Sequence, residues 1–249
     1  IRRKDMFEYY YFFFGLLLLC ALISGVVQSK LQKTYAAQRE IPTVSHMTGY
    51  DTAVRLLKAG GVNDIKVGKV KGILSDHYHP TKKIVNLSEG VYGDDSVAAV
   101  AIAAHEIGHV MQKKKGYLPY KLRTVLVPIT NIGSRLALPL VLLGLLLDLF
   151  VLGGQDSQLG FYLALAGVVL YGLSTLFMLV TLPVEFNASK RAKKMLVEEG
   201  ILTEEESPYA EKMLSAAALT YVASLLTSLV YFLRFAGWVL LLFGRGRRR

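Results

Sequence analysis

The sequence predicts an α-helical membrane protein with four transmembrane helices and a small α+β domain. Three observations support this fold class. Hydrophobic residues make up 53% of the 249 positions, they gather in four long runs, and the residues between the runs include a polar region of domain size. A disordered chain would be poor in aliphatic and aromatic residues, and an ordinary soluble domain would not need apolar runs of this length.

Four segments reach the length of about 20 mainly apolar residues that one helical crossing of a bilayer needs. They are Tyr9–Val27, Leu136–Gly153, Leu159–Val184 and Leu214–Gly244. We expect the first to be an anchor, because its apolar run is longer than that of a typical signal peptide and no clear cleavage site follows it. Cys20, the single cysteine, lies inside this anchor, which excludes a disulfide framework and a cysteine metal site.

Only two charges fall inside these runs, Asp148 and Arg234. Charges are costly in hydrocarbon, so we expect these two side chains to form an ion pair. The alternatives are that each reaches the interface or lines a water-filled cavity. Neither alternative gives them a catalytic role.

The short link at 154–158 reverses the chain between the second and third runs. The polar regions 30–135 and 185–213 must therefore face the same side of the membrane. In the larger region, alternating residues predict short strands around Ile65–Val67 and Val85–Leu87, on either side of a turn at His79-Pro80.

A helix expected at about 96–113 contains the pattern His105-Glu106-x-x-His109. Residues four apart share a helix face, so the two imidazoles can bind one metal ion. Zinc is the favoured ion, because it takes imidazole and carboxylate ligands and leaves one position to water in catalytic sites. Glu106 stands where its carboxylate can take the proton of that water and pass it to a leaving amine. The alternative, a chance match on a surface helix, fits poorly with the eight small or apolar residues of Val97–Ala104.

Two histidines need a third protein ligand. Asp148 would supply it in an intramembrane metalloprotease, but the apolar stretch before His105 is too short for a membrane span. Glu185 is the better candidate, because it follows the third apolar run on the side that also holds His105. If its segment is helical, Ser189 lies one turn further on the same face and can hydrogen-bond a metal ligand. The alternatives for Glu185 are a charge favoured at a helix N-terminus and an interfacial anchor after Pro183.

Five short blocks and the first apolar run carry a resemblance to a known family. The blocks are Ser75–Tyr78, Leu87–Tyr92, Ala103–His109, Leu126–Ser134 and Thr181–Ser189. On these residues the chain resembles the YugP-like family of bacterial membrane zinc metallopeptidases. The resemblance implies a zinc peptidase with His105, His109 and Glu185 as metal ligands and Glu106 as general base. The chain is more distantly similar to membrane peptidases of the HtpX/Ste24 kind, whose third-ligand segment reads Glu-x-x-Ala-Asp, and Ser189 stands at the position of that Asp.

In glutamate-type zincins a histidine or tyrosine steadies the oxyanion that develops on the substrate. His77 and Tyr78 are candidates for this role or for substrate contact. The alternative for His77 is a loop histidine that caps the following turn, and His79 is given no role. We expect the strand Ile84–Leu87 to be the sheet edge that binds substrate backbone by strand addition.

These elements predict an ordered series of regions. We expect a transmembrane anchor at 7–29, a zincin-like catalytic region at 30–135, a transmembrane hairpin at 136–184, a third-ligand helical segment at 185–213, a transmembrane helix at 214–244 and a basic tail at 245–249.

The predicted function is a membrane-anchored, zinc-dependent endopeptidase of the gluzincin type that acts on peptides or membrane proteins. The alternative is a catalytically weak scaffold or adaptor of a membrane protein complex, against which the intact Glu106 argues. The expected partners are the lipid bilayer, the substrate and such a complex, and no motif points to nucleic acid.

The positive charge, 29 Lys and Arg against 19 Asp and Glu, indicates an orientation. Basic residues that flank the spans on the side of the two polar regions are Lys30, Lys33, Arg39, Lys121, Arg123, Arg135, Lys190, Arg191, Lys193 and Lys194. The link at 154–158 has none, so the positive-inside rule places the zinc site on the cytoplasmic side of the cell membrane. Basic residues near both chain ends oppose this orientation. Met6 resembles a natural start, so we expect the residues before it to be an upstream extension.

Overall fold

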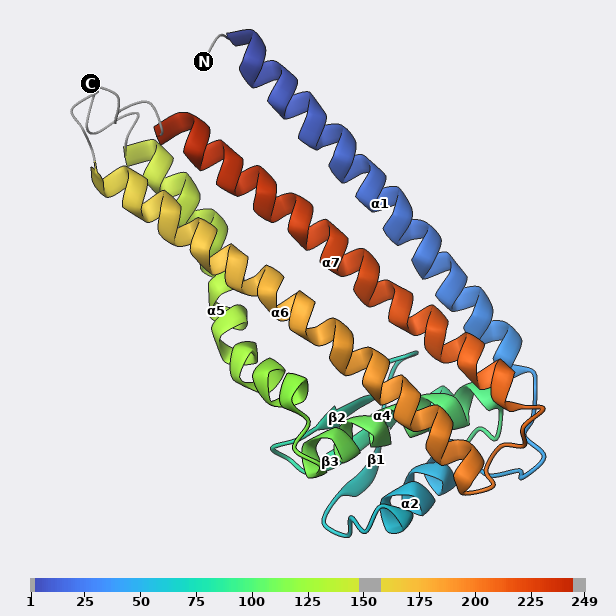
Figure 1. Cartoon of the computed structure of the whole chain (residues 1–249). Coiled ribbons are helices and arrows are strands. Elements are labelled where there is room, and N and C mark those ends of the chain that lie inside the picture. Colours follow the sequence, from blue (N-terminus) through green and yellow to red (C-terminus); the bar gives the residue numbers. More distant parts are fainter. Residues whose placement is uncertain (1–2, 148–157, 244–249) are drawn as a thin grey trace. The chain divides into compact units, whose positions relative to one another are not determined.

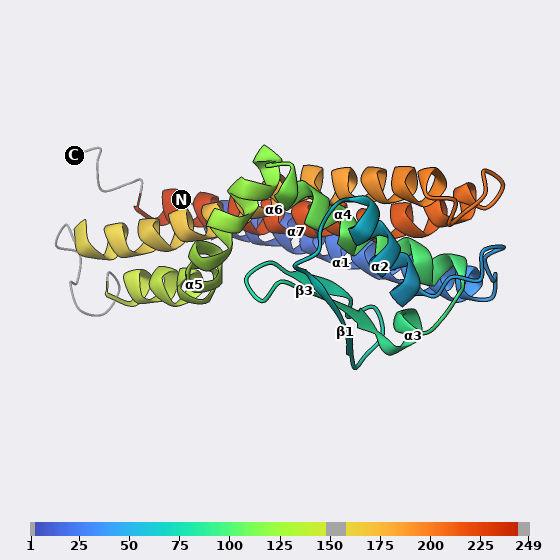
Figure 2. The same cartoon turned by 90° about the horizontal axis from the view of Figure 1, so that it is seen from below.

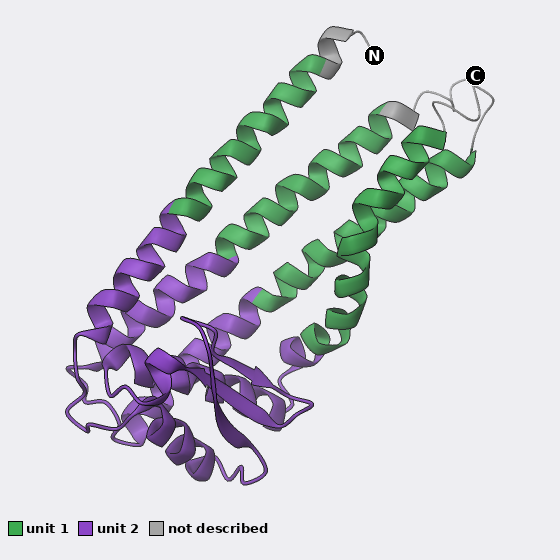
Figure 3. Cartoon of the chain, turned by 180° about the vertical axis from the view of Figure 1, so that it is seen from behind, with its two compact units in different colours: residues 1–25, 122–181, 222–249 green, residues 26–121, 182–221 purple. Residues whose placement is uncertain are grey.

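The computed structural model describes residues 3–147 and 158–243, which form helices and one small sheet (Figure 1). The elements are α1 Arg3–Arg39, α2 Gly49–Ala59, β1 Lys66–Val70, β2 His77–His79, β3 Ile84–Ser88, α3 Glu89–Tyr92, α4 Val97–Lys114, α5 Leu118–Leu146, α6 Gln158–Glu198 and α7 Ser207–Phe243. The chain divides into two compact units, which Figure 3 shows in different colours. The first comprises residues 1–25, 122–181 and 222–249, and the second residues 26–121 and 182–221.

Four of the described helices are long and apolar enough to cross a membrane. The candidate spans are Phe7–Arg39, Leu118–Leu146, Gln158–Glu198 and Ser207–Leu241. A mostly helical chain with four such helices and a small sheet confirms the general fold class. Asp148, most of the link at 154–158 and the tail at 245–249 lie outside the described residues, and so does the expected pair of Asp148 with Arg234.

The first unit is built from helices that pack through small residues. A Cβ atom on Gly167 of α6 would lie 2.5 Å from the carbonyl oxygen of Ala137 in α5, so these two helices approach backbone to backbone. Between α6 and α7, the hydroxyl oxygens of Thr175 and Ser228 lie 2.9 Å apart. Close approach at small residues and hydroxyl contacts between helices are typical of packing in membranes, where lipid is as apolar as leucine.

The second unit holds the sheet, whose strand order is β1-β3-β2. Strand β1 pairs with β3 in parallel, and β2 pairs with β3 antiparallel, with Tyr78 opposite Val85. In Figure 2 helices α4 and α2 lie on one side of this sheet. Helix α4 forms the interior of the unit, because every residue of Val97–Ala104 is buried.

Two details of the sheet differ from the sequence prediction. The residues His77–His79 form a strand, and the turn lies just after them at 80–83, where Lys83 takes a left-handed conformation with φ 51°. Because β2 then pairs with one side of β3 and β1 with the other, the strand Ile84–Ser88 is central. The expectation that Ile84–Leu87 forms the sheet edge is therefore wrong, and the edges are β1 and β2.

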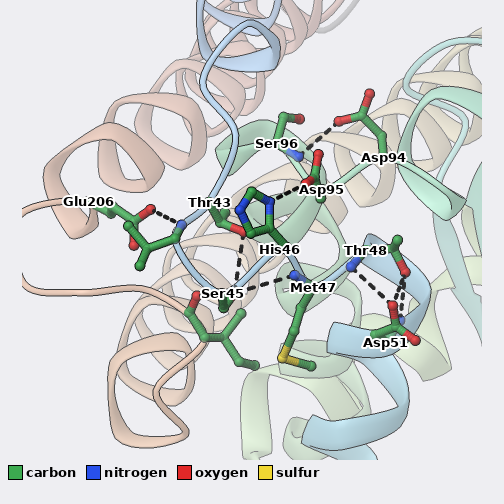
Figure 4. A network of polar contacts seen from close by, with 12 residues as sticks. Thr43, Ser45, His46, Met47, Thr48, Asp51, Asp94, Asp95, Ser96 and Glu206 are labelled. Atoms are coloured by element: carbon green, nitrogen blue, oxygen red, sulfur yellow. Dashed lines mark hydrogen bonds and ion pairs between the residues drawn. The ribbon is translucent and has the colours of Figure 1, made fainter.

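The loop between α1 and α2 is held by a polar network (Figure 4). The carboxylate of Glu206, in the connection from α6 to α7, accepts a hydrogen bond from the backbone N–H of Val44 at 2.8 Å. His46 Nδ1 lies 3.0 Å from a carboxylate oxygen of Asp95 on the exposed surface. Thr48 and Asp51 form a reciprocal capping box that starts α2. This network ties the connections of the second unit together.

Candidate metal centre

Helix α4 places His105, Glu106 and His109 at the end of a buried helical segment. Ser96 caps the helix, with its hydroxyl accepting a hydrogen bond from the N–H of Ala99 at 3.2 Å. The apolar turns that follow are buried on every face, and burial continues from Glu106 to Gln112, so the motif lies within the buried part of α4. Glu106 and His109 are each 8% exposed, and His105 is partly buried.

Helix α6 brings Glu185 to these histidines through a close approach at Gly108. A Cβ atom on Gly108 would lie 2.6 Å from the carbonyl oxygen of Ala188, so any larger residue would push α6 away from α4. Glu185 is 1% exposed. Its Oε2 lies 3.1 Å from Nε2 of His105 and 3.5 Å from Nε2 of His109. One ligand atom from each of the three side chains lies within 4.8 Å of the others.

The other ring nitrogens contact supporting side chains. Nδ1 of His105 lies 3.1 Å from Oγ of Ser189, the hydrogen bond that the sequence predicts if the segment after Glu185 is helical. Nδ1 of His109 lies 3.0 Å from Oε1 of Gln112. Both imidazoles therefore turn Nε2 toward Glu185.

Gln112 determines which nitrogen of His109 carries the hydrogen. The amide nitrogen of Gln112 donates to the carbonyl oxygen of Val184 at 2.7 Å and to Oδ1 of Asn187 at 3.1 Å. A carbonyl oxygen only accepts, so the amide oxygen of Gln112 must face His109, whose Nδ1 donates to it. The lone pair of the neutral imidazole then lies on Nε2, the nitrogen that faces Glu185. Asn187 is held in turn by Nε of Arg191 at 2.7 Å.

Glu106 is positioned by the edge strand β2. The backbone N–H of Tyr78 donates to Oε2 of Glu106 at 2.8 Å. The start of β2 is fixed by Asp76, whose carboxylate accepts hydrogen bonds from the N–H and the hydroxyl of Ser88. Burial raises the pKa of Asp76 above its ordinary value, and the charge of Glu106 acts in the same direction. Burial also raises the pKa of the Tyr78 hydroxyl to about 12, so this group stays protonated at neutral pH.

Comparison with known proteins assigns the chain to a family. Residues 13–240 match the family described as "Putative neutral zinc metallopeptidase". The chain belongs to this family. It is 40% identical over 213 residues to the "Putative membrane protease YugP" of Bacillus subtilis (strain 168), a match that covers 86% of this chain and 90% of the relative. No solved structure matches the chain.

The side chains of His105, His109 and Glu185 fit the zinc cofactor of this family. Two neutral imidazole nitrogens and one carboxylate oxygen are the ligands that zinc takes in many catalytic sites. A carboxylate as deeply buried as Glu185 is costly unless a cation balances its charge. A divalent ion among these three atoms supplies that charge, so burial and ligand chemistry agree with zinc binding by this group.

The structure brings four of the site residues predicted from sequence together and leaves His77 apart from them. His105, Glu106 and Glu185 line one cavity, and His109 joins them through the shared contact with Glu185. His77 is exposed, and its ring nitrogens lie near the carbonyl oxygen of Ser75 and the side-chain amide of Asn86. The oxyanion role of His77 thus stays a prediction, without a contact in the described residues that supports it.

Gln112 and Asn187 were not anticipated from the sequence. Gln112 follows His109 by three positions, so helical spacing alone places it on the same face of α4. Asn187 is two positions from Glu185, and its link to the histidines passes through Gln112. The first could have been found from spacing, whereas the second needs the packing of α6 on α4.

Proposed function

We propose that this chain is a zinc-dependent endopeptidase in which His105, His109 and Glu185 hold the metal and Glu106 is the general base. The observation that carries the proposal is the three-residue group within 4.8 Å, whose members His105 and Glu185 share a cavity with Glu106. This is the side-chain set that peptide hydrolysis by activated water requires.

Zinc bound at this group supplies Lewis acidity, which polarises the scissile carbonyl and lowers the pKa of water. Glu106 accepts a proton from the water whose oxygen bonds to the carbonyl carbon. It then donates this proton to the amide nitrogen as the carbon–nitrogen bond breaks. Because the backbone N–H of Tyr78 donates a hydrogen bond to Oε2 of Glu106, the other carboxylate oxygen, Oε1, is the atom that takes up the proton.

The finer fold assignment, a zincin-like catalytic region, also belongs to this proposal. Its support is the small sheet packed beside the helix that carries the His-Glu-x-x-His pattern. The edge strand β2 is the strand that contacts Glu106, so substrate backbone addition is assigned to β2 instead of β3. The region boundaries that the sequence predicts are part of the same proposal.

Removal of the metal tests the proposed function directly. We expect the purified full-length chain in detergent to contain about one zinc per chain, the stoichiometry of a catalytic site with three protein ligands. It should cleave an unstructured reporter protein, lose this activity with a chelator and recover it on addition of zinc. Metal content is measured by elemental analysis and cleavage by mass spectrometry of the products. Cleavage that persists in zinc-free protein would contradict the proposal.

We also place the site on the cytoplasmic side, which the basic residues beside the spans support. The exposed residue Lys82 offers a reporter position, because the native Cys20 is buried. A Lys82→Cys variant should react with a membrane-impermeant maleimide only after the cells are permeabilised. The unchanged chain gives the background labelling of Cys20. Labelling of the variant in intact cells would show that the site faces the other side of the membrane.

A further inference from the structure

A cavity of about 230 Å³ lies beside the metal-ligand group in the second unit. The polar residues of its lining are Asp76, His105, Glu106, Glu185, Ser189, Thr220 and Tyr221. The rest of the lining is apolar and comes from α1, α4, α7 and the loop before β2. These residues include Leu31, Leu74, Ile102, Met213, Ala217 and Ala218.

Helix α7 supplies the largest part of the apolar wall. Met213 and Leu214 are followed one turn later by Ala217 and Ala218, a spacing that places all four along one side of the helix. Two alanines at this point leave room that larger side chains would fill. Ala217 is partly buried, whereas Met213, Leu214 and Ala218 are buried, so the methyl group of Ala217 is the most accessible apolar group that α7 contributes to this wall.

Leu74 forms another part of the wall from a strained backbone. It has a φ of 53°, a left-handed conformation that is unfavourable for a residue with a branched side chain. Its neighbour Ile73 is 78% exposed, whereas Leu74 packs against the core and lines the cavity. The strained backbone therefore places the aliphatic side chain of Leu74 in the same cavity as Glu106 and His105.

We infer that this cavity is a subsite for one aliphatic side chain of the substrate, next to the bond that is cut. The inference rests on the proposed peptidase function and names its substrate class: peptides with a residue such as leucine beside the scissile bond. The apolar wall favours such a side chain by removing it from water. The carboxylates of Asp76 and Glu106 disfavour an acidic one. Ala217 and Leu74 set the size that the cavity accepts.

The test uses zinc-loaded, full-length chain and peptides that differ only in the residues flanking the cut, with Ala, Leu, Phe, Asp or Lys. We expect kcat/KM for the Leu peptide to exceed that for the Asp and Lys peptides at least tenfold, as size and polarity discrimination in an apolar pocket allows (about 10- to 200-fold per methylene). Ala217→Leu should lower cleavage of the Leu peptide about tenfold and spare the Ala peptide. Ser215→Leu adds the same side chain at an exposed position of α7 outside the cavity and should leave the preference unchanged.

A second variant changes the cavity in the opposite direction. Leu74→Ala should extend cleavage to the Phe peptide, while Ile73→Ala, its exposed neighbour, should not. Equal cleavage of all peptides by the wild type, a preference for Lys or Asp, or unchanged preferences in both cavity variants would overturn the inference and leave the peptidase function intact. If zinc-loaded wild type cuts no peptide or reporter, the proposed function fails and the inference fails with it.

Discussion

Glu106→Gln is expected to keep its zinc and to lose peptidase activity by about 10²- to 10⁴-fold, the usual contribution of a general acid and base. Glutamine has the size of glutamate, and its amide oxygen can accept the hydrogen bond that the N–H of Tyr78 donates to Oε2 at 2.8 Å. The side chain should therefore stay in place. What it loses is the ability to take a proton from water and to return it to the leaving amine.

The measurement compares zinc content and kcat for cleavage of an unstructured reporter in detergent. Glu89→Gln is the matched control, because Glu89 is an exposed glutamate of the same unit and lies outside the cavity. The control should cleave at the wild-type rate. A Glu106→Gln variant that retains zinc and also cleaves at the wild-type rate would show that the proposed mechanism is wrong.

Much of the framework for this site can be predicted from short-range patterns. Apolar runs of span length predict the four long helices, because a helix crosses the hydrocarbon core only if enough consecutive residues are apolar, and this can be counted along the sequence. The spacing of His105 and His109 predicts a shared helix face for the same reason. The proposal of Glu185 as third ligand needs a longer argument: the link after the second span is expected to return the chain to the first side. The same helical spacing predicts that Ser189 contacts a metal ligand, and the structure shows that this ligand is His105.

The remaining features depend on pairings between distant segments. The parallel pairing of β1 with β3 places β3 in the centre of the sheet, and no local pattern in Ile84–Leu87 distinguishes a central strand from an edge. The role of Gly108 becomes visible only when α6 lies against α4. Likewise, the cavity wall formed by Ala217 and Ala218 comes from a helix that hydropathy marks only as a membrane span.

Glu185→Ala is expected to lose zinc outright, with a fall in affinity larger than the roughly 10- to 100-fold that removal of a supporting residue costs. The change removes the carboxylate whose Oε2 faces Nε2 of both histidines at 3.1 and 3.5 Å. Two imidazoles alone do not complete a three-ligand site. Peptidase activity should disappear together with the metal, which distinguishes this variant from Glu106→Gln.

Zinc affinity is measured by competition with a chelator, and a thermal melt of the metal-free protein shows whether the variant is folded. Glu198→Ala is the matched control, because Glu198 lies on the same helix with an exposed side chain that pairs with Lys194. It should bind zinc as the wild type does. Glu185→Gln keeps the size of the side chain and an oxygen donor but removes the negative charge, so we expect an intermediate affinity. Full zinc retention by folded Glu185→Ala would show that another residue is the third ligand. The buried carboxylate of Glu185 would then serve only to join α6 to α4.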